Sequence, residues 1–209
     1  SYSALEQRPL TVLTLAYRLW AGARLLQYNP FVEQRIHPSL RGGAPGREVN
    51  HVWYEMSLAV EQALLEGGAT IQDGLCGMPM DLQKASDLCP TEITMRLLEH
   101  TGMPKPIVKA LRGFYAGIQC VYAHGGVVGE RFRKTAGLFQ GCPWSMLAMS
   151  NMTTVWAHLM DQQQVQPMGY VDDLNVIAKG VGATERLQSA ADETKRWTDI
   201  TKQRLSPSK

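Results

Sequence analysis

Residues 168–178 read Met168-Gly169-Tyr170-Val171-Asp172-Asp173-Leu174-Asn175-Val176-Ile177-Ala178, an apolar run that two adjacent acids interrupt. Apolar residues on both sides of a short polar pair are typical of a β-hairpin, and Asp172 and Asp173 would lie at its tip. Two neighbouring carboxylates repel each other and resist burial, so a fold keeps them together mainly where a divalent cation supplies positive charge. We therefore expect Asp172 and Asp173 to bind metal.

A third acid, Asp81, follows a second apolar stretch, Met78-Pro79-Met80. If the strand that leads to Asp81 lies beside the hairpin, the three carboxylates reach one point. Three carboxylates around two Mg²⁺ ions, roughly 3.5–4 Å apart, form a site for nucleotidyl transfer. We expect Asp81 and Asp172 to bridge both ions, and Mn²⁺ to substitute for Mg²⁺.

The Asp81 segment, the stretch Gln140-Gly141-Cys142-Pro143-Trp144-Ser145 and the acidic hairpin stand in the order of the palm motifs of reverse transcriptases. The chain resembles the enzymes of non-LTR retrotransposons most, followed by those of group II introns. Four further stretches fit the same pattern: Arg8-Pro9-Leu10 with Tyr17-Arg18-Leu19-Trp20, Gly42-Gly43-Ala44-Pro45-Gly46-Arg47, Leu111-Arg112-Gly113-Phe114-Tyr115-Ala116-Gly117, and Leu205-Ser206-Pro207-Ser208-Lys209. The resemblance implies an RNA-directed DNA polymerase that uses an RNA template, a DNA primer and deoxynucleoside triphosphates.

The resemblance also implies that Asp173 is auxiliary to Asp81 and Asp172, and it implies roles for residues outside the acids. Gln140 and Gly141 would lie beside the incoming nucleotide, and Arg47 would contact its triphosphate. Lys209 matches the lysine that ends the last palm motif, where an ammonium group offsets charge on departing pyrophosphate. Ser86 stands where the family has an aromatic side chain that excludes ribonucleotides. Lesser candidates for contacts with the template backbone are Arg131, Arg133 and Lys134.

Three positions depart from the family pattern. Besides Ser86, Ala44 replaces an arginine, and Pro79 lacks the backbone donor that a central strand needs. Because of these three departures, the alternative function is a catalytically decayed palm domain that only binds nucleic acid or a protein partner. We expect Asp87 to cap or pair locally and do not include it in the site. A polymerase that makes RNA is a further reading, which the Tyr170-Val171-Asp172-Asp173 form argues against.

Helices that alternate with short strand pairs predict an α+β fold in which helices pack on one face of an antiparallel sheet. By resemblance this is the fingers and palm of a right-hand polymerase, with the thumb absent. We expect a fingers-like part at residues 1–68 and a palm at residues 69–209, with a fingers insertion at about 105–140. The chain begins at Ser1 and stops inside a family motif, so we interpret it as a fragment of a longer polyprotein with a thumb and, as one option, an endonuclease domain.

Apolar periodicity predicts a helix over about residues 9–28, ended by Tyr28-Asn29-Pro30, and a second from Val49 to Gly67. Their expected buried faces are Leu13, Leu15, Leu19, Ala23 and Leu26, and Val52, Met56, Val60 and Leu64. Further helices are expected at about 90–98, 106–117, 143–160 and 183–205, the last with a face of Leu187, Ala190, Thr194, Trp197 and Thr201. A hairpin is expected around His124-Gly125-Gly126.

The composition of the 209 residues, 44% hydrophobic and 19% charged, predicts a globular chain. No apolar stretch is long enough for a membrane span and no signal peptide is visible, so we expect a nuclear or cytoplasmic protein.

The net charge of +2 is modest, but the segment before residue 50 has six arginines and no lysine, which suits phosphate contacts. The four cysteines form no Cys-x-x-Cys pair and the five histidines fall singly, so the spacing predicts free thiols and no zinc site.

Overall fold

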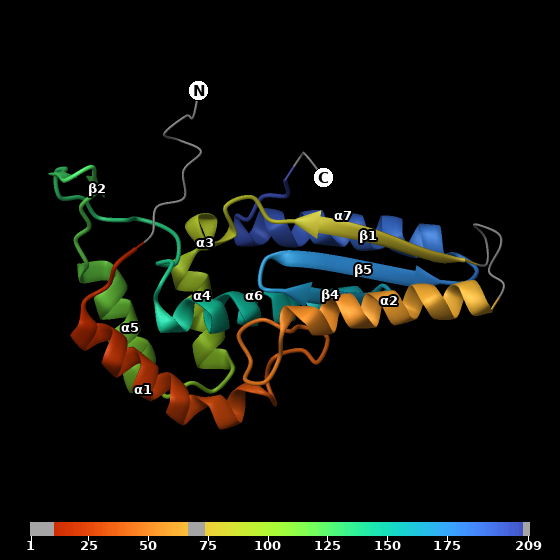
Figure 1. Ribbon diagram of the computed structural model, residues 1–209, viewed down its shortest axis with the longest axis horizontal. Helices are drawn as coiled ribbons and strands as arrows, with labels where there is room; N and C mark the ends of the chain where they lie inside the picture. The colour runs from red at the N-terminus through yellow and green to blue at the C-terminus, as the bar shows by residue number, and fades with distance from the viewer. Residues whose placement is uncertain (1–10, 67–73, 207–209) are drawn as a thin grey trace.

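The computed structural model describes residues 11–66 and 74–206 (Figure 1). The helices are α1 (Leu15–Val32), α2 (Val49–Leu65), α3 (Ala85–Leu88), α4 (Thr91–His100), α5 (Lys105–Gly117), α6 (Pro143–Gln162) and α7 (Ala183–Thr201). The strands are β1 (Leu75–Asp81), β2 (Ala123–His124), β3 (Val127–Val128), β4 (Gln166–Tyr170) and β5 (Asp173–Lys179). Within these described ranges no helix combines the length and the hydropathy needed to cross a membrane.

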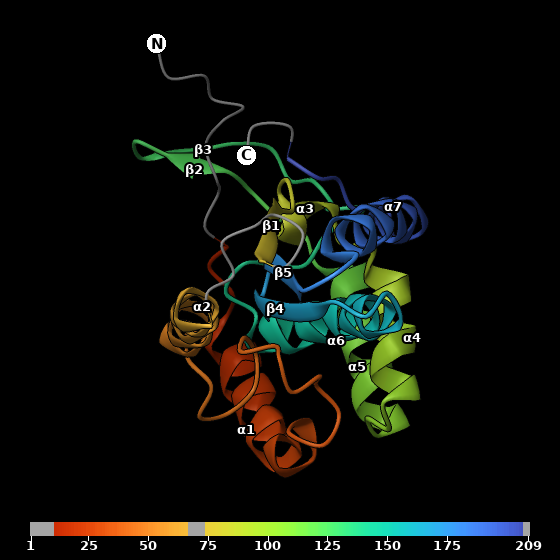
Figure 2. The same cartoon turned by 90° about the vertical axis from the view of Figure 1, so that its right-hand side faces the viewer.

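The central sheet is antiparallel with the order β1-β5-β4. Its residues alternate between two faces. Leu174, Val176 and Ala178 of β5 belong to the main core, together with buried residues of α6 and α7 such as Trp156 and Trp197. In the end-on view of Figure 2, α6 and α7 lie on this side of the sheet. This arrangement confirms the predicted α+β class.

One helix, α2, covers part of the opposite face. Val52 of α2 packs with Met168 of β4 and Ile177 of β5, and Met56 and Ala59 lie against the same cluster. Figure 2 shows α2 on the other side of the sheet from α6 and α7. Ion pairs between Arg41 and Glu55 and between Lys179 and Glu66 hold α2 in place.

The predicted buried face of α1 is mostly wrong, since of its residues only Leu13, which precedes the helix, is buried in the core. Leu15, Leu19 and Leu26 are 69%, 65% and 70% exposed, whereas Tyr28 and Val32 are buried. The Tyr28 hydroxyl donates to the Thr101 carbonyl oxygen, and its ring lies near Trp144, so a polar aromatic residue packs where we expected leucines. Tyr28-Asn29-Pro30 does not end the helix either; α1 runs through Pro30 to Val32, because residues on both sides of the proline pack into the core.

The predicted face of α2 is partly wrong. Val52 is buried, but Val60 and Leu64 are 44% and 74% exposed. Side chains spaced four apart drift by about 40° per step around a helix of 3.6 residues per turn. Ala59, which continues the face from Val52 and Met56 with a step of three, packs against the sheet instead.

The remaining elements follow the predictions with two corrections. The hairpin turns at Gly125 and Gly126, as expected, and Ala190 and Trp197 are buried on α7. However, α7 ends at Thr201 and not near Leu205, because Lys202 adopts a left-handed conformation (φ 58°) and Leu205 forms an antiparallel bridge with Leu82. Pro79 lies in an edge strand, where a residue without an N–H is tolerated, so our concern about a central strand was unfounded.

Candidate active site

The three predicted acids lie at one end of the sheet. Asp81 is the last residue of β1, and its partner in the antiparallel register is Asp173, the first residue of β5. Directly opposed residues in such a pair project to the same face with Cβ atoms about 4.5–5.5 Å apart. Asp172 precedes Asp173 in the two-residue turn from β4. The structure thus places acidic residues separated by about 90 positions in the sequence at the same end of the sheet.

The Asp81 and Asp173 side chains project to the face opposite α6 and α7, since their neighbours Met80 and Leu174 pack into the main core. On this same face, two and four residues before Asp81, β1 carries Pro79 and Gly77. Both are exposed. A strip of small, exposed residues therefore leads along the sheet to the acids, while α2 covers the opposite end, near Leu75 and Ile177.

The turn that carries Asp172 has an unusual backbone. Val171 has φ +58°, a left-handed conformation that is an outlier for a β-branched residue. Such strain costs of order 1–3 kcal/mol and persists only where the surroundings hold it. A segment of four residues, 39–42, supplies this support: the Arg41 amide donates to the Gly169 carbonyl oxygen over 2.8 Å, and Leu40 bridges to Gly169.

Gly42 brings this segment directly against the turn. A Cβ on Gly42 would lie 2.5 Å from Val171 Cγ2 and 2.7 Å from the Val171 backbone nitrogen. The carbonyl oxygen of Gly42 accepts a hydrogen bond of 2.7 Å from the Ser150 hydroxyl of α6. The segment 39–42 is thus clamped between α6 and the acidic hairpin. Sequence reasoning missed this contact, because only tertiary packing reveals it.

Gln140 and Gly141 lie in the loop before α6. Gly141 has φ +103°, and a Cβ there would lie 2.8 Å from the Thr11 carbonyl oxygen, so this position requires glycine. The Leu138 amide donates to the Ser86 carbonyl oxygen over 2.6 Å, which ties the loop to the segment that follows Asp81. Gln140 lines a cavity of about 250 Å³ whose wall also includes Asp87 of α3 and Tyr122.

The basic residues predicted to contact phosphate groups differ in their surroundings. Arg47 donates from Nη1 to the carbonyl oxygens of His37 and Leu40, so part of its guanidinium supports the loop after α1. Lys134 forms an ion pair of 2.8 Å with Asp87, so this acid is paired as expected, but with a residue 47 positions away and not with a local one. Arg131 and Arg133 are exposed, and Lys209 lies outside the described residues.

Aromatic residues, half-buried or buried, and a buried thiol anchor the loop before α6. The Tyr17 hydroxyl lies 3.0 Å from Cys142 Sγ, and the Tyr17 ring stacks on Phe114 at 3.6 Å. Burial, followed by the proximity of Cys142, raises the pKa values of Tyr17 and Tyr115, so both phenols stay neutral. These contacts connect α1 and α5 to the start of α6, whose N-terminus carries Pro143 at the first position.

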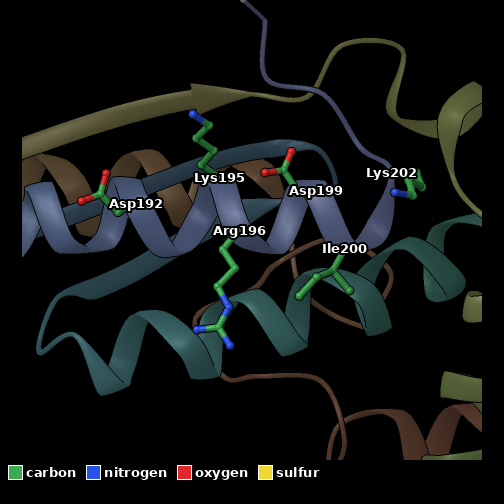
Figure 3. A pocket seen from close by; sticks show the side chains of 6 residues that line it. All are labelled: Asp192, Lys195, Arg196, Asp199, Ile200 and Lys202. Atoms are coloured by element: carbon green, nitrogen blue, oxygen red, sulfur yellow. The ribbon is translucent and has the colours of Figure 1, made fainter.

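A hollow over α7 lies apart from these residues. Asp192, Lys195 and Asp199 follow one another along the helix with Arg196 and Lys202 nearby (Figure 3). Opposite charges three or four residues apart are typical of a solvated helix face. We assign no function to this hollow.

The chain matches the family model for reverse transcriptase (RNA-dependent DNA polymerase) over residues 4–209. Among solved structures, it is similar to telomerase from Candida tropicalis in complex with a TWJ fragment of telomeric RNA, with 13% identity and a TM-score of 0.64 over 91% of this chain and 32% of that chain. Apo telomerase from the same organism, truncated from the C-terminal domain, shares 12% identity with a TM-score of 0.57 over 93% and 41% of the two chains.

Telomerase from Candida albicans, in complex with a TWJ fragment of telomeric RNA, has 11% identity and a TM-score of 0.59 over 92% of this chain and 33% of that chain. At such identities the likeness concerns the fold. The chain spans between 32% and 41% of the length of these three structures. The search of the curated proteins found no match.

Proposed function

The chain belongs to the reverse transcriptase (RNA-dependent DNA polymerase) family, and from this we propose that it forms the fingers and palm of a retroelement enzyme that copies RNA into DNA. Residues 1–68 would be the fingers-like part and residues 69–209 the palm, with a fingers insertion at about 105–140. A thumb, and an endonuclease domain where the element encodes one, would come from a longer protein. We propose a nuclear or cytoplasmic site of action.

The observation that carries this proposal is the register of Asp81 opposite Asp173, with Asp172 adjacent in the turn. Three acidic residues at one end of a sheet offer an all-oxygen donor set, which suits hard cations such as Mg²⁺. Two such ions, when bound, activate the primer 3′-hydroxyl and neutralise charge on the triphosphate. The protein's own part is to hold Asp81, Asp172 and Asp173 in a fixed arrangement, and the segment 39–42 supports this by fixing the turn.

The nucleotide would bind between the acids and the loop before α6. The hydrogen bond between Leu138 and Ser86 supports this placement, because it connects Gln140 and Gly141 to the segment that follows Asp81. Gln140 would contact the sugar or base and Ser86 would lie near the 2′ position. Arg47 would contact the triphosphate with the part of its guanidinium that does not bind the loop after α1, and Lys209 would stabilise the departing pyrophosphate.

A second candidate function is nucleic-acid or protein binding by a catalytically decayed palm. It is favoured by Ala44, which is 8% exposed where the family has an arginine, and by the engagement of Arg47 Nη1 with two backbone carbonyls. The alanine removes one positive charge from the loop, and the two carbonyl oxygens occupy one nitrogen of Arg47 that a triphosphate would otherwise contact.

Two measurements test the proposal. The first is Mn²⁺ binding by residues 1–209, which we expect to be stoichiometric and to weaken in Asp172→Asn. The matched control is Asp199→Asn, an exposed acid on α7 on the other side of the sheet. The second is RNA-templated primer extension by a longer protein that includes a thumb. Stoichiometric binding with extension supports the polymerase, whereas no Mn²⁺ binding and no extension would support the decayed palm.

A further inference from the structure

A second group of metal-ligating side chains lies outside the acidic hairpin. His37 comes from the connection between α1 and α2, and His158 and Asp161 lie three residues apart on α6, so they share one face of that helix. His37 Nε2 lies 2.9 Å from Asp161 Oδ2, and His158 Nδ1 lies 3.9 Å from the same oxygen. The ligand atoms of all three residues lie within 4.8 Å of one another.

The distances between these ligand atoms, 2.9 and 3.9 Å, lie on either side of the distance between ligand atoms in a metal site. With bonds of about 2.0–2.1 Å in a tetrahedral arrangement, ligand atoms lie roughly 3.3 Å apart. His158 and Asp161 are 63% and 50% exposed, so small side-chain rotations can close the arrangement around an ion that arrives from solvent. His37 is held more firmly: it is 8% exposed, and its amide donates to the Thr154 hydroxyl.

We propose that His37, His158 and Asp161 bind a divalent ion of the zinc class, with water in the fourth position. Two imidazoles and one carboxylate suit zinc and neighbouring transition metals, whereas Mg²⁺ prefers oxygen ligands alone. The site therefore differs in chemistry from the three acids and shares no residue with them. It does not depend on the polymerase proposal.

The surroundings of His37 fit a ligand role. Nδ1 lies 2.7 Å from the Ser39 hydroxyl, and when Nε2 binds an ion, Nδ1–H donates to that oxygen and fixes the ring. Without an ion, the Ser39 hydroxyl and amide can donate to Nδ1, and Nε2–H donates to Asp161. Binding then places the ion on Nε2 and leaves the ring's single proton on Nδ1, so the neutral imidazole changes tautomer and His37 releases no net proton.

The ion would connect α6 to the segment that supports the acidic hairpin. The His37 carbonyl oxygen accepts from Arg47, and two residues later Ser39 begins the segment 39–42 that packs on Gly169 and Val171. The ion would replace the contact of His37 with Asp161 by two metal bonds and add a link to His158, which limits the movement of this segment. Zinc would thereby stabilise the hairpin from a distance, without touching its acids.

The test is calorimetric titration of residues 1–209 with ZnCl₂ in excess MgCl₂, which occupies oxygen-only sites. We expect one ion per chain, and His158→Ala and Asp161→Asn should each weaken binding by at least about 10-fold, since even indirect partners of a ligand contribute that much. The control is His124→Ala, an exposed histidine on β2. Co²⁺ in place of zinc should give a visible absorption band that both ligand variants lose.

Hydrogen exchange provides the second readout. Zinc should increase the protection of the Arg41 amide, which bonds to the Gly169 carbonyl oxygen, and His158→Ala should abolish the increase. Absent stoichiometric binding, or equal affinity in His158→Ala and the unsubstituted chain, would overturn the site. Unchanged protection of Arg41 despite binding would overturn its connection to the hairpin.

Discussion

Replacing Gly42 with alanine should disturb the turn that carries Asp172 through a direct collision. The new Cβ would lie 2.5 Å from Val171 Cγ2 and 2.7 Å from the Val171 nitrogen. Unstrained carbon contacts lie at about 3.5–4.0 Å, so the two segments must separate by roughly 1 Å. The segment that contains Gly42 cannot withdraw freely, because the Ser150 hydroxyl holds its carbonyl oxygen from the other side.

The expected magnitudes follow from this displacement. Overpacking of this kind costs about 1–3 kcal/mol of unfolding free energy, which corresponds to a fall in Tm of roughly 2–12 °C for a domain of this size. Because Asp172 follows Val171 directly, its carboxylate shifts with the turn. A misplacement of about 1 Å at a reacting centre costs on the order of 100-fold in rate.

Urea unfolding of residues 1–209 measures the first quantity, and primer extension by the longer protein measures the second. The matched control is Gly113→Ala in α5, where a Cβ would meet nothing within 4 Å. It should gain about 1 kcal/mol, because alanine favours a helix, and leave extension unchanged. The double change Gly42→Ala with Val171→Ala removes the side-chain collision but not the backbone one, so it should recover only part of the loss.

The reasoning would be refuted if Gly42→Ala unfolded at the same urea concentration as the unsubstituted chain and extended primers at the same rate. In that case the 39–42 segment would not press on the turn, and the left-handed conformation of Val171 would need another source of support.

Other expected outcomes concern chemistry, selectivity, thiols and nucleic-acid binding. Asp172→Asn should lower the extension rate by several orders of magnitude while the Tm stays equal or rises slightly, because one repulsive charge is lost; normal extension would exclude metal ligation there. Ser86→Phe should restore a preference for deoxyribonucleotides that the unsubstituted enzyme lacks, as single-nucleotide extension with both sugars would measure; a strong initial preference would contradict this. Burial raises the pKa of the Cys89 thiol to about 11, so its contribution to stability is full below about pH 8.5 and is lost as pH rises through 11. The stability difference between the unsubstituted chain and Cys89→Ala should shrink over that range, and iodoacetamide at pH 8 should modify Cys76 and Cys120 first; early modification of Cys89 would count against this. Residues 1–209, with a net charge of +2, should bind primer-template weakly and lose binding steeply as salt rises; tight, salt-insensitive binding in a filter assay would contradict it.

The parts of the fold that the sequence predicted are those that local patterns specify. An apolar run around two acids leaves little choice but a hairpin, and the turn at Gly125 and Gly126 is equally local. The face of α7 was also predictable, because Ala190, Thr194 and Trp197 keep the helical period. In each case neighbours in the sequence determine the structure.

Features that depend on distant packing could not be predicted. In α1 the core accepts Tyr28 because Thr101 satisfies its hydroxyl, a partner 73 positions away. His37 and His158 fall singly in the sequence, and only the passage of the α1–α2 connection beside α6 brings them together. The spacing of residues in the sequence therefore could not predict the zinc-class site that we propose there.

Because β1 is an edge strand of the sheet, its outer side bears on whether molecules of this protein pair with one another. The Ser206 amide donates to the Asp81 carbonyl oxygen, so the backbone groups of Asp81 face away from β5. In an antiparallel strand the residue two positions earlier, Pro79, faces the same way. Pro79 offers no N–H to a strand from another molecule, and residues 204–206 already cover the end of the edge. Pro79 therefore makes it harder for a strand of another molecule to pair with β1, and such pairing is the step by which exposed sheet edges aggregate.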